Sequence, residues 1–256
     1  EGDGDFRSDE LKALRDQSDF VITNPPFSLF RKFLAWVVDG NKKFVLIGNM
    51  NAITYKETFE LIQSDRLWLG ATANGSDMVF AVPPGSDIKL ADREKASRLG
   101  YEGDFTRLGN SCWFTSIDHG RRHQSLSLMT MSDNKKFSKH KEINAVGYRK
   151  YDNYDALEVP FTDAIPSDFE GIMGVPISFL SKYSPEQFEI LGMCENHDLY
   201  GLKTKRYTSA ECKEAYFSKF KKTGTYDLNA SGVLDVNGQL EKVYQRILIR
   251  HRSPSK

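Results

Sequence analysis

The first quarter of the chain alternates short apolar runs with helix-like segments, and this order constrains the fold more than any other feature. Phe20–Ile22 is an apolar run, and the next segment, 28–38, places apolar residues at helical spacing behind Ser28 as a plausible N-cap. The continuous apolar run 42–49 and the amphipathic stretch 55–64 then repeat the order. Short connections and uninterrupted apolar strands predict an α/β fold with a mainly parallel sheet whose strands are buried.

After Trp68 the pattern changes to strands that follow one another without helices. The segments 77–83, 111–118 and 124–131 predict such strands, and His119–Arg122 is a candidate hairpin between the last two. The sheet is therefore predicted to finish with an antiparallel edge.

The rest of the chain differs in composition, which indicates a second region. We place the boundary after residue 131, so that 1–131 form a core and 132–256 a C-terminal region, with 242–252 as its last strand. From Leu199 onward the chain has 12 Lys and Arg residues against 5 Asp and Glu residues, a balance of +7. A basic C-terminal third favours a polyanionic partner. A solvated lysine-rich surface is the alternative.

Cysteine spacing and hydropathy exclude several classes of protein. Cys112, Cys194 and Cys212 form no Cys-x-x-Cys pair, so they favour neither a disulfide scaffold nor a zinc site. Isolated thiols suit the reducing cytoplasm. The acidic residues 1–10 do not resemble a signal peptide. No run approaches the roughly 18 consecutive apolar residues of a membrane span, and we expect no membrane and no metal as partners.

The segment 23–27, Thr-Asn-Pro-Pro-Phe, directly follows the first apolar strand. In an open parallel sheet, ligands bind beyond the carboxyl ends of the strands, and this segment would lie at such an end. Because Pro25 and Pro26 restrict the backbone, they hold the Asn24 amide and the preceding peptide groups in a fixed orientation. Phe27 supplies an apolar face on which a planar ring can stack.

Two rigid oxygen acceptors, the Asn24 amide and the Pro25 carbonyl, suit an amino group with two N–H donors. The amino group of adenine is a poor nucleophile because its lone pair is delocalised into the ring. Acceptors that hold both hydrogens favour a more tetrahedral nitrogen and stabilise the positive charge that develops during attack on an electrophile. The alternative interpretation is an ordinary turn, since Asn-Pro-Pro is common in turns.

The 23–27 segment resembles the catalytic motif of S-adenosylmethionine-dependent methyltransferases that act on amino groups, in the form typical of adenine-N6 DNA enzymes. The resemblance implies Asn24, Pro25, Pro26 and Phe27 as catalytic residues.

An upstream segment, residues 2–6, resembles the acidic-aromatic motif of the same enzymes. The resemblance implies that Asp5 accepts a hydrogen bond from the adenine amino group of S-adenosylmethionine and that Phe6 packs on its ring. A loop of Asp and Gly before a helix is the alternative.

Five segments together resemble the EcoRI-type adenine-specific DNA methyltransferases. This resemblance implies a Rossmann-like methyltransferase fold and a site-specific enzyme of a restriction-modification system, which methylates the N6 amino group of adenine in DNA. Residues 1–131 would then be the catalytic core and 132–256 the region for target recognition. The five segments are 3–8, 21–33, 43–57, 171–192 and 243–250.

The family places a glycine-rich cofactor loop, Phe-x-Gly-x-Gly, before its acidic-aromatic motif, together with a ribose-binding acid. Here that motif lies at residues 2–6. We therefore expect a fold that is incomplete at the N-terminus and that binds S-adenosylmethionine weakly by itself. The segment 171–176 is the only faint downstream candidate for the loop, and no convincing strand precedes it, which argues against a permuted order.

A DNA duplex hides the amino group of adenine, so the base must rotate out of the stack. Phe27 would support the extruded base, and Trp113 or Phe114 could cover its other face, although core positions explain these two better. Phosphate contacts need basic side chains, and the predicted hairpin places Arg121 and Arg122 at its tip. Double-stranded DNA is the partner we expect.

Two rival interpretations remain at the level of sequence. Similar Asn-Pro-Pro-aromatic motifs occur in methyltransferases of RNA adenine and of protein glutamine. The basic C-terminal third argues against a protein substrate but not against RNA. The chain could also be a DNA-binding remnant without turnover, because it lacks the glycine-rich loop.

Overall fold

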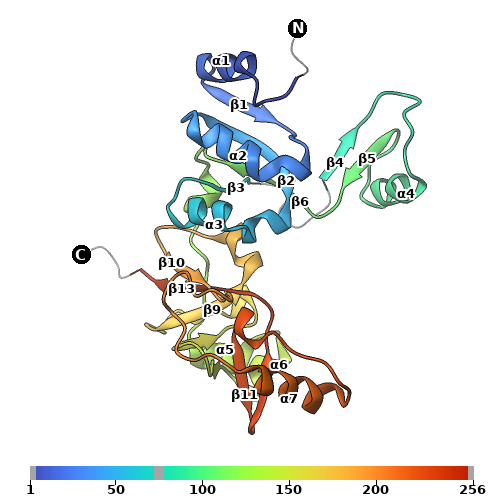
Figure 1. Cartoon of the computed structure of the whole chain (residues 1–256). Coiled ribbons are helices and arrows are strands. Elements are labelled where there is room, and N and C mark those ends of the chain that lie inside the picture. The colour runs from blue at the N-terminus through green and yellow to red at the C-terminus, as the bar shows by residue number, and fades with distance from the viewer. Residues whose placement is uncertain (1–3, 72–77, 253–256) are drawn as a thin grey trace. The chain divides into compact units, whose positions relative to one another are not determined.

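The structure is a computed structural model that describes residues 4–71 and 78–252 (Figure 1). It is a mixed α/β structure with several sheets. The chain forms two compact units, residues 1–121 and 122–256, which we call the N-terminal and C-terminal units. The sequence pattern favoured a boundary somewhat later, after residue 131.

The main sheet of the N-terminal unit has four strands in the order β1-β2-β6-β3. β1 runs parallel to β2, with Ile22 beside Val45, whereas β6 runs antiparallel to both β2 and β3. The two expected strands form a parallel pair, and antiparallel pairing follows at β6 and β3. The expectation of a mainly parallel sheet is not met in the described residues of this sheet, because only one of its strand pairs is parallel. The strands are β1 (Phe20–Thr23), β2 (Lys43–Asn49), β3 (Trp68–Leu69) and β6 (Ser111–Thr115).

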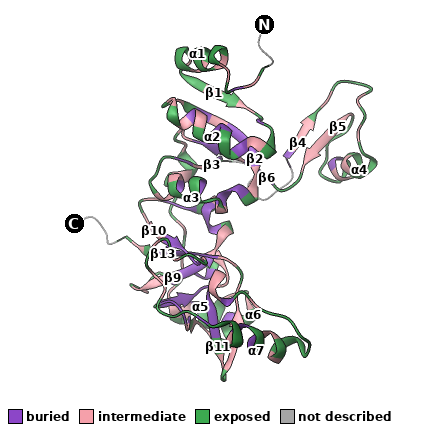
Figure 2. Ribbon diagram, in the orientation of Figure 1, coloured by how far each residue is buried: buried purple, intermediate pink, exposed green. Residues whose placement is uncertain are grey.

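The first strand is less buried than its apolar sequence predicts. Phe20 is 51% exposed and Ile22 is 69% exposed. Both side chains lie on the same face of β1 because strand residues alternate between faces, and among the described residues β1 pairs with β2 alone. Figure 2 shows β1 in the colours of exposed and intermediate residues, whereas Phe44 and Leu46 of β2, one strand further in, are buried. The expectation of a buried strand is thus wrong for β1 and right for β2.

Helices connect these strands as the periodicity predicts. Phe33, Leu34 and Val37 form the buried stripe of α2. The expected N-cap at Ser28 is wrong, because a 3₁₀ turn precedes the α-helix and places Leu29 at the N-cap without a side-chain hydrogen bond. The helical segments are α1 (Asp9–Gln17), η1 (Phe27–Leu29), α2 (Phe30–Asp39), η2 (Met50–Thr54) and α3 (Lys56–Gln63).

The segment between β3 and β6 forms a separate antiparallel pair with one helix. It consists of β4 (Met78–Ala81), α4 (Leu90–Arg98) and β5 (Phe105–Leu108), and β4 pairs with β5. The strand expected over 77–83 corresponds to β4, although its first residue lies outside the described part of the chain.

The strand expected over 124–131 and the hairpin before it are wrong. Gly120–His123 form a 3₁₀ turn, η3, and α5 begins at Met131. The backbone of Leu126 is bonded instead by a side chain, because Gln187 accepts from its N–H (2.7 Å) and donates to its carbonyl (2.9 Å). These bonds replace the ladder that a second strand would supply.

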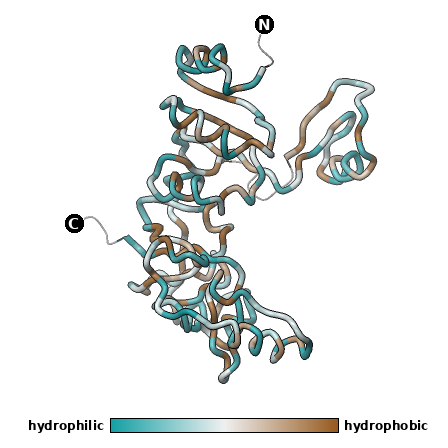
Figure 3. Tube along the Cα trace, viewed as in Figure 1, coloured by the Kyte–Doolittle hydropathy of each residue, from teal (hydrophilic) through white to brown (hydrophobic). Residues whose placement is uncertain are grey.

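The C-terminal unit is built around a five-stranded sheet in the order β10-β13-β9-β8-β7. The strand expected near the end of the chain is confirmed as β13, which pairs with neighbours on both sides. Its residues Ile247, Leu248 and Ile249 are buried. Figure 3 shows that hydrophobic (brown) and hydrophilic (teal) stretches alternate along the trace. The strands are β7 (Arg149–Lys150), β8 (Ala156–Glu158), β9 (Ile172–Pro176), β10 (Phe188–Met193) and β13 (Arg246–His251).

The remaining elements of this unit surround the sheet. A two-stranded hairpin turns at Asn237 and Gly238, both with positive φ. The longest helix of the unit, α7, begins with a capping box between Thr208 and Glu211. The elements are α5 (Met131–Phe137), α6 (Lys141–Val146), η4 (Thr162–Ala164), η5 (Ile177–Lys182), α7 (Ser209–Phe220), η6 (Leu228–Ala230), β11 (Val233–Val236) and β12 (Gln239–Lys242).

The cysteines are buried free thiols. Burial raises the pKa of Cys112 to about 12. Across residues 4–71 and 78–252, the acidic, His and Cys side chains form no group of three or more that could hold a metal ion. Within the same residues, every helix is too short or too polar to cross a bilayer.

Candidate active site

A pocket of about 590 Å³ lies at the carboxyl end of β1 and brings the two sequence motifs together. Asp5 and Phe6 line it from the upstream motif, and Asn24, Pro25 and Pro26 line it from the strand tip. This position agrees with the rule that ligands bind beyond the carboxyl ends of parallel strands. The other lining residues are Gly4, Leu11, Val21, Thr23, Leu29, Phe33 and Trp36.

The strand tip holds two oxygen acceptors that other described residues leave unused. The Asn24 side chain is exposed and Pro25 is buried. Across the part of the chain that the structure describes, no group donates a hydrogen bond to the Asn24 amide or to the Pro25 carbonyl oxygen. The Pro26 carbonyl, in contrast, accepts from Leu29 N–H at 2.9 Å and so begins η1. The prolines therefore turn the chain directly from the strand into this helical turn.

Phe27, the aromatic residue of the motif, is the first residue of η1. Its side chain is 39% exposed, and it is not among the residues that line the pocket. Leu29, Phe33 and Trp36 supply the apolar wall in its place.

The acidic residue of the upstream motif is held by its neighbour. Arg7 donates to Asp5 Oδ1 from its backbone N–H and from Nε, each at 2.9 Å, and Arg7 Nη2 pairs with Oδ2. These hydrogen bonds lower the pKa of Asp5 to about 2. Asp5 is therefore ionised at neutral pH and can only accept hydrogen bonds.

The aromatic residue of the upstream motif is fixed by packing. Phe6 is 8% exposed, and its ring meets Phe33 and Trp36 edge-on at centroid distances of 5.1 and 5.7 Å. Trp36 is held in turn by Arg15 of α1, which donates to its carbonyl oxygen at 2.7 Å and places its guanidinium 5.0 Å from the indole ring. The upstream motif is thus anchored on the inner face of α2.

The other aromatic candidates lie outside this pocket. Phe114 is fully buried on β6 and packs on Phe30 with a centroid distance of 5.0 Å. Trp113 is half-buried, and its carbonyl oxygen accepts from Gly70 N–H at 2.9 Å. Phe114 is thus a core residue, and neither ring lines the pocket.

The basic pair expected at a hairpin tip lies in the 3₁₀ turn η3 instead. Arg121 is exposed and donates from Nη1 to the Ala71 carbonyl oxygen, and Arg122 is half-buried. His123, which follows them, makes a hydrogen-bond contact between its Nδ1 and Glu186 Oε1 at 2.5 Å. Along the chain, the N-terminal unit ends at Arg121 and the C-terminal unit begins at Arg122, and neither residue lines the pocket at β1.

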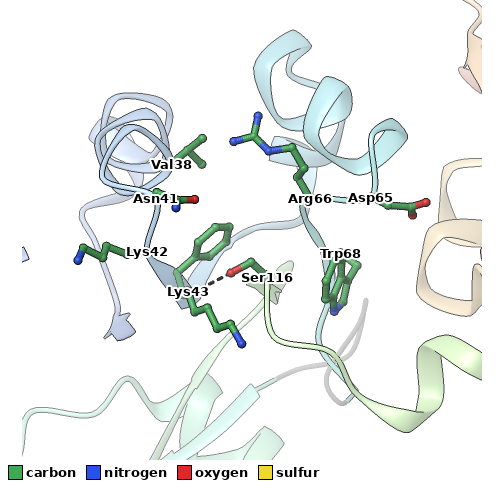
Figure 4. A pocket seen from close by; sticks show the side chains of 9 residues that line it. Val38, Asn41, Lys42, Lys43, Asp65, Arg66, Trp68 and Ser116 are labelled. Atoms are coloured by element: carbon green, nitrogen blue, oxygen red, sulfur yellow. Dashed lines mark hydrogen bonds between the residues drawn. The ribbon is translucent and has the colours of Figure 1, made fainter. Parts of the chain in front are cut away.

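A second pocket, of about 320 Å³, lies at the amino ends of β2 and β3, opposite the end where the motifs meet (Figure 4). Three of its polar side chains make hydrogen bonds within the N-terminal unit. Ser116 Oγ accepts from Phe44 N–H at 3.0 Å, Lys42 Nζ donates to the Asp16 carbonyl oxygen at 2.8 Å, and Trp68 Nε1 donates to a backbone carbonyl. We therefore assign no chemistry to this pocket.

Comparison with known proteins identifies one family. The family model described as the adenine-specific methyltransferase EcoRI matches residues 1–252. The chain is 44% identical over 191 residues to the Type II methyltransferase M.EcoRI of Escherichia coli, a match that covers 74% of this chain and 55% of that protein.

Two mycoplasma proteins are also similar. M.MgeORF184P of Mycoplasma genitalium is 34% identical over 250 residues, covering 97% of this chain and 69% of the relative. M.MpnI of Mycoplasma pneumoniae is 35% identical over 209 residues, covering 80% and 62%. Both are named Type II methyltransferases. The matches span between 55% and 69% of the lengths of these relatives. No solved structure matches the chain.

Proposed function

This chain belongs to the EcoRI family of adenine-specific methyltransferases, and from that premise we propose that the protein methylates the N6 amino group of adenine in double-stranded DNA. The methyl donor in this proposal is S-adenosylmethionine, and the protein acts in a restriction-modification system in the cytoplasm. The Type II names of the three relatives support a DNA substrate over RNA or a protein glutamine. A Rossmann-like arrangement of the N-terminal unit belongs to the same proposal, and the parallel β1–β2 pair supports it.

The observation that carries the proposal is the single pocket lined by both motifs. Its volume of about 590 Å³ falls within the roughly 300–1,000 Å³ of small-molecule sites. Asp5 offers an ionised acceptor for the amino group of the cofactor adenine, and Phe6 offers an apolar ring beside it. The residues present therefore suit S-adenosylmethionine, which supplies an electrophilic methyl group when it is bound.

The strand tip would prepare the amino nitrogen for attack. The Asn24 amide oxygen and the Pro25 carbonyl oxygen would accept hydrogen bonds from its two N–H groups and so draw the lone pair out of conjugation with the ring. S-adenosylmethionine would supply the methyl group to which this lone pair forms the new N–C bond, and one of the two protons on nitrogen would then pass to solvent. Neither acceptor is a strong base, so their contribution is electrostatic stabilisation of the positive charge on nitrogen.

The target base must leave the duplex to reach this tip. Phe27 is exposed and directly follows Pro26, which lines the pocket, so it can stack on an extruded base. Arg121 and Arg122 would contact phosphates. In the proposed division of labour, residues 1–131 perform the chemistry and residues 132–256 hold the DNA.

Calorimetric titration with S-adenosylmethionine tests the cofactor site. Asp5→Asn removes the anionic acceptor without emptying the pocket, and we expect it to weaken binding by about tenfold or more. Asp9→Asn, an exposed carboxylate on α1, is the matched control and should bind as the wild type does. Wild-type affinity in the Asp5 variant would contradict the assignment.

Identification of the methylated product tests the substrate. After incubation with tritiated cofactor, the label should appear in N6-methyladenine released from duplex DNA. Label recovered in RNA or in a glutamine side chain would overturn the DNA assignment and leave the methyltransferase assignment standing.

A further inference from the structure

The C-terminal end of α7 presents lysines and aromatic rings together at the surface of the C-terminal unit. Phe217 is 54% exposed, and Phe220 is 45% exposed. Tyr244, on the connection between β12 and β13, is 87% exposed. Three exposed lysines, Lys213, Lys221 and Lys222, accompany these rings. We call these six residues the α7 surface.

Phe217 and Tyr244 lie outside the apolar cluster that attaches α7 to its own unit, whereas Phe220 packs on Tyr226 at the edge of that cluster. The buried side of the helix consists of Cys212 and Ala215, which pack in one cluster with Leu228 and Val233. Phe217 stands four residues after Lys213, so the two side chains are neighbours on the helix surface. The helix therefore places a lysine and an apolar ring side by side facing water.

The lysines are more numerous than the helix requires. Within the residues that the structure describes, Lys213, Lys221 and Lys222 form no ion pair, whereas Lys219 pairs with Glu241 at 3.6 Å. The partial charge at a helix C-terminus is only about −0.5. The three lysines carry more positive charge than is required to balance this partial negative charge. They create a local positive potential, which attracts a polyanion.

A cavity lies next to the C-terminal end of α7 and makes part of the α7 surface concave. It has a volume of about 730 Å³, and Phe220, Lys242 and Tyr244 are among the residues that line it. Tyr216, Phe220 and Tyr226 pack against one another with tilted or edge-on rings, at centroid distances between 4.8 and 5.7 Å. Lys222 Nζ lies 6.0 Å from the Phe220 ring centre. The cavity wall thus contains aromatic rings, and two lysines, Lys219 and Lys242, line it as well.

We infer that the α7 surface binds the phosphodiester backbone of duplex DNA, an inference that rests on the proposed function. The three lysines contact phosphates, and the exposed rings pack on the sugars beside them. Charge complementarity favours this partner, because the lysines are positive and the phosphates are negative. In protein–DNA complexes, about half of the hydrogen bonds or more go to phosphate and sugar. The exposed aromatic rings add apolar area that can pack on the deoxyribose groups beside the phosphates.

The salt dependence of DNA binding tests the inference. In the triple variant Lys213→Gln, Lys221→Gln, Lys222→Gln, fluorescence anisotropy with a labelled duplex should show weaker binding. The slope of log affinity against log salt should fall in magnitude by about 2 to 3, at ~0.9 per lost phosphate contact. Tyr244→Ala should weaken binding and leave that slope unchanged.

A matched control separates a local effect from loss of total charge. Lys136→Gln, Lys141→Gln, Lys150→Gln removes three exposed lysines elsewhere in the same unit, and it should change the slope by less than about 1. Equal slopes in the two triple variants would overturn the α7 surface while the DNA substrate stands. If the wild type binds no duplex at all, the α7 surface and the proposed substrate both fail, although S-adenosylmethionine binding still tests the cofactor site separately.

Discussion

Removal of the Glu158 carboxylate should destabilise the C-terminal unit strongly. Glu158 on β8 is 6% exposed and lies between two donors. Arg246 of β13 donates from Nη2 to Oε1 at 2.7 Å, and the Tyr151 hydroxyl donates to Oε2. Burial, reinforced by the charge of Glu158, raises the pKa of Tyr151 well above its ordinary value, so the phenol keeps its proton and remains a donor.

The size of the expected loss of stability follows from the two buried groups that Glu158→Ala leaves without a partner. Arg246 is only 8% exposed, and removal of one partner of a buried ion pair costs about 3–5 kcal/mol. The Tyr151 hydroxyl also loses its acceptor, which adds about 1–3 kcal/mol. The double variant Glu158→Leu, Arg246→Met buries no charge, so we expect it to lose less than half as much stability as the single variant.

Urea unfolding, monitored by far-UV circular dichroism, measures this loss of stability. Trp36, Trp68 and Trp113 are the three tryptophans of the chain, and all lie in the N-terminal unit, so fluorescence reports that unit separately. The dichroism midpoint should fall in Glu158→Ala and largely recover in the double variant. A loss below about 1 kcal/mol, or a double variant as unstable as the single one, would refute the reasoning.

Three smaller perturbations test other features. Thr208→Ala removes the capping box of α7 and should cost about 0.5–2 kcal/mol in thermal unfolding, whereas Thr208→Ser should not; equal melting of the two variants would contradict the cap. In Gly48→Ala the new Cβ would meet the Phe114 ring at 2.8 Å, so overpacking should cost about 1–3 kcal/mol in urea unfolding. Because hydrogen bonds from Arg7 lower the pKa of Asp5 to about 2, its contribution to stability is complete above the ordinary pKa of the carboxyl and is lost as pH falls through about 2. Carbon-13 NMR titration should show this low midpoint and an upward shift in Arg7→Gln; an unchanged midpoint would contradict the cause.

Local periodicity predicted the elements of the N-terminal unit well. The apolar run at 42–49 became β2, and the helical spacing over 28–38 became α2, because both patterns are properties of neighbouring residues. The exposure of the β1 side chains could not be predicted in the same way. Exposure of Phe20 and Ile22 depends on which elements pack on that face of β1, and the spacing of apolar residues does not encode such tertiary packing.

A contact between residues distant in sequence explains the strand that is absent at 124–131, and turn chemistry explains the hairpin that was not predicted. The alternating segment 124–131 has the period of a strand, yet Gln187, distant in sequence, bonds its backbone at Leu126. The Asn237-Gly238 pair is a strong hairpin signal, and attention to it would have predicted β11 and β12.

The candidate site could be predicted in part. The resemblance indicated both motifs, and the structure places Asp5, Phe6 and Asn24 in one pocket. The pairing of Asp5 with Arg7 and the packing of Phe6 on α2 depend on side-chain geometry that motif spacing does not specify.

The most direct test of the account is the single-turnover rate of methyl transfer by Asn24→Ala with saturating DNA and cofactor. If the Asn24 amide holds the adenine amino group during attack, the rate should fall by about 10²- to 10³-fold, while the affinity for duplex DNA stays within about twofold of wild type because phosphate contacts dominate it. A rate within a few-fold of wild type would contradict the account, since the strand tip would then take no part in the reaction.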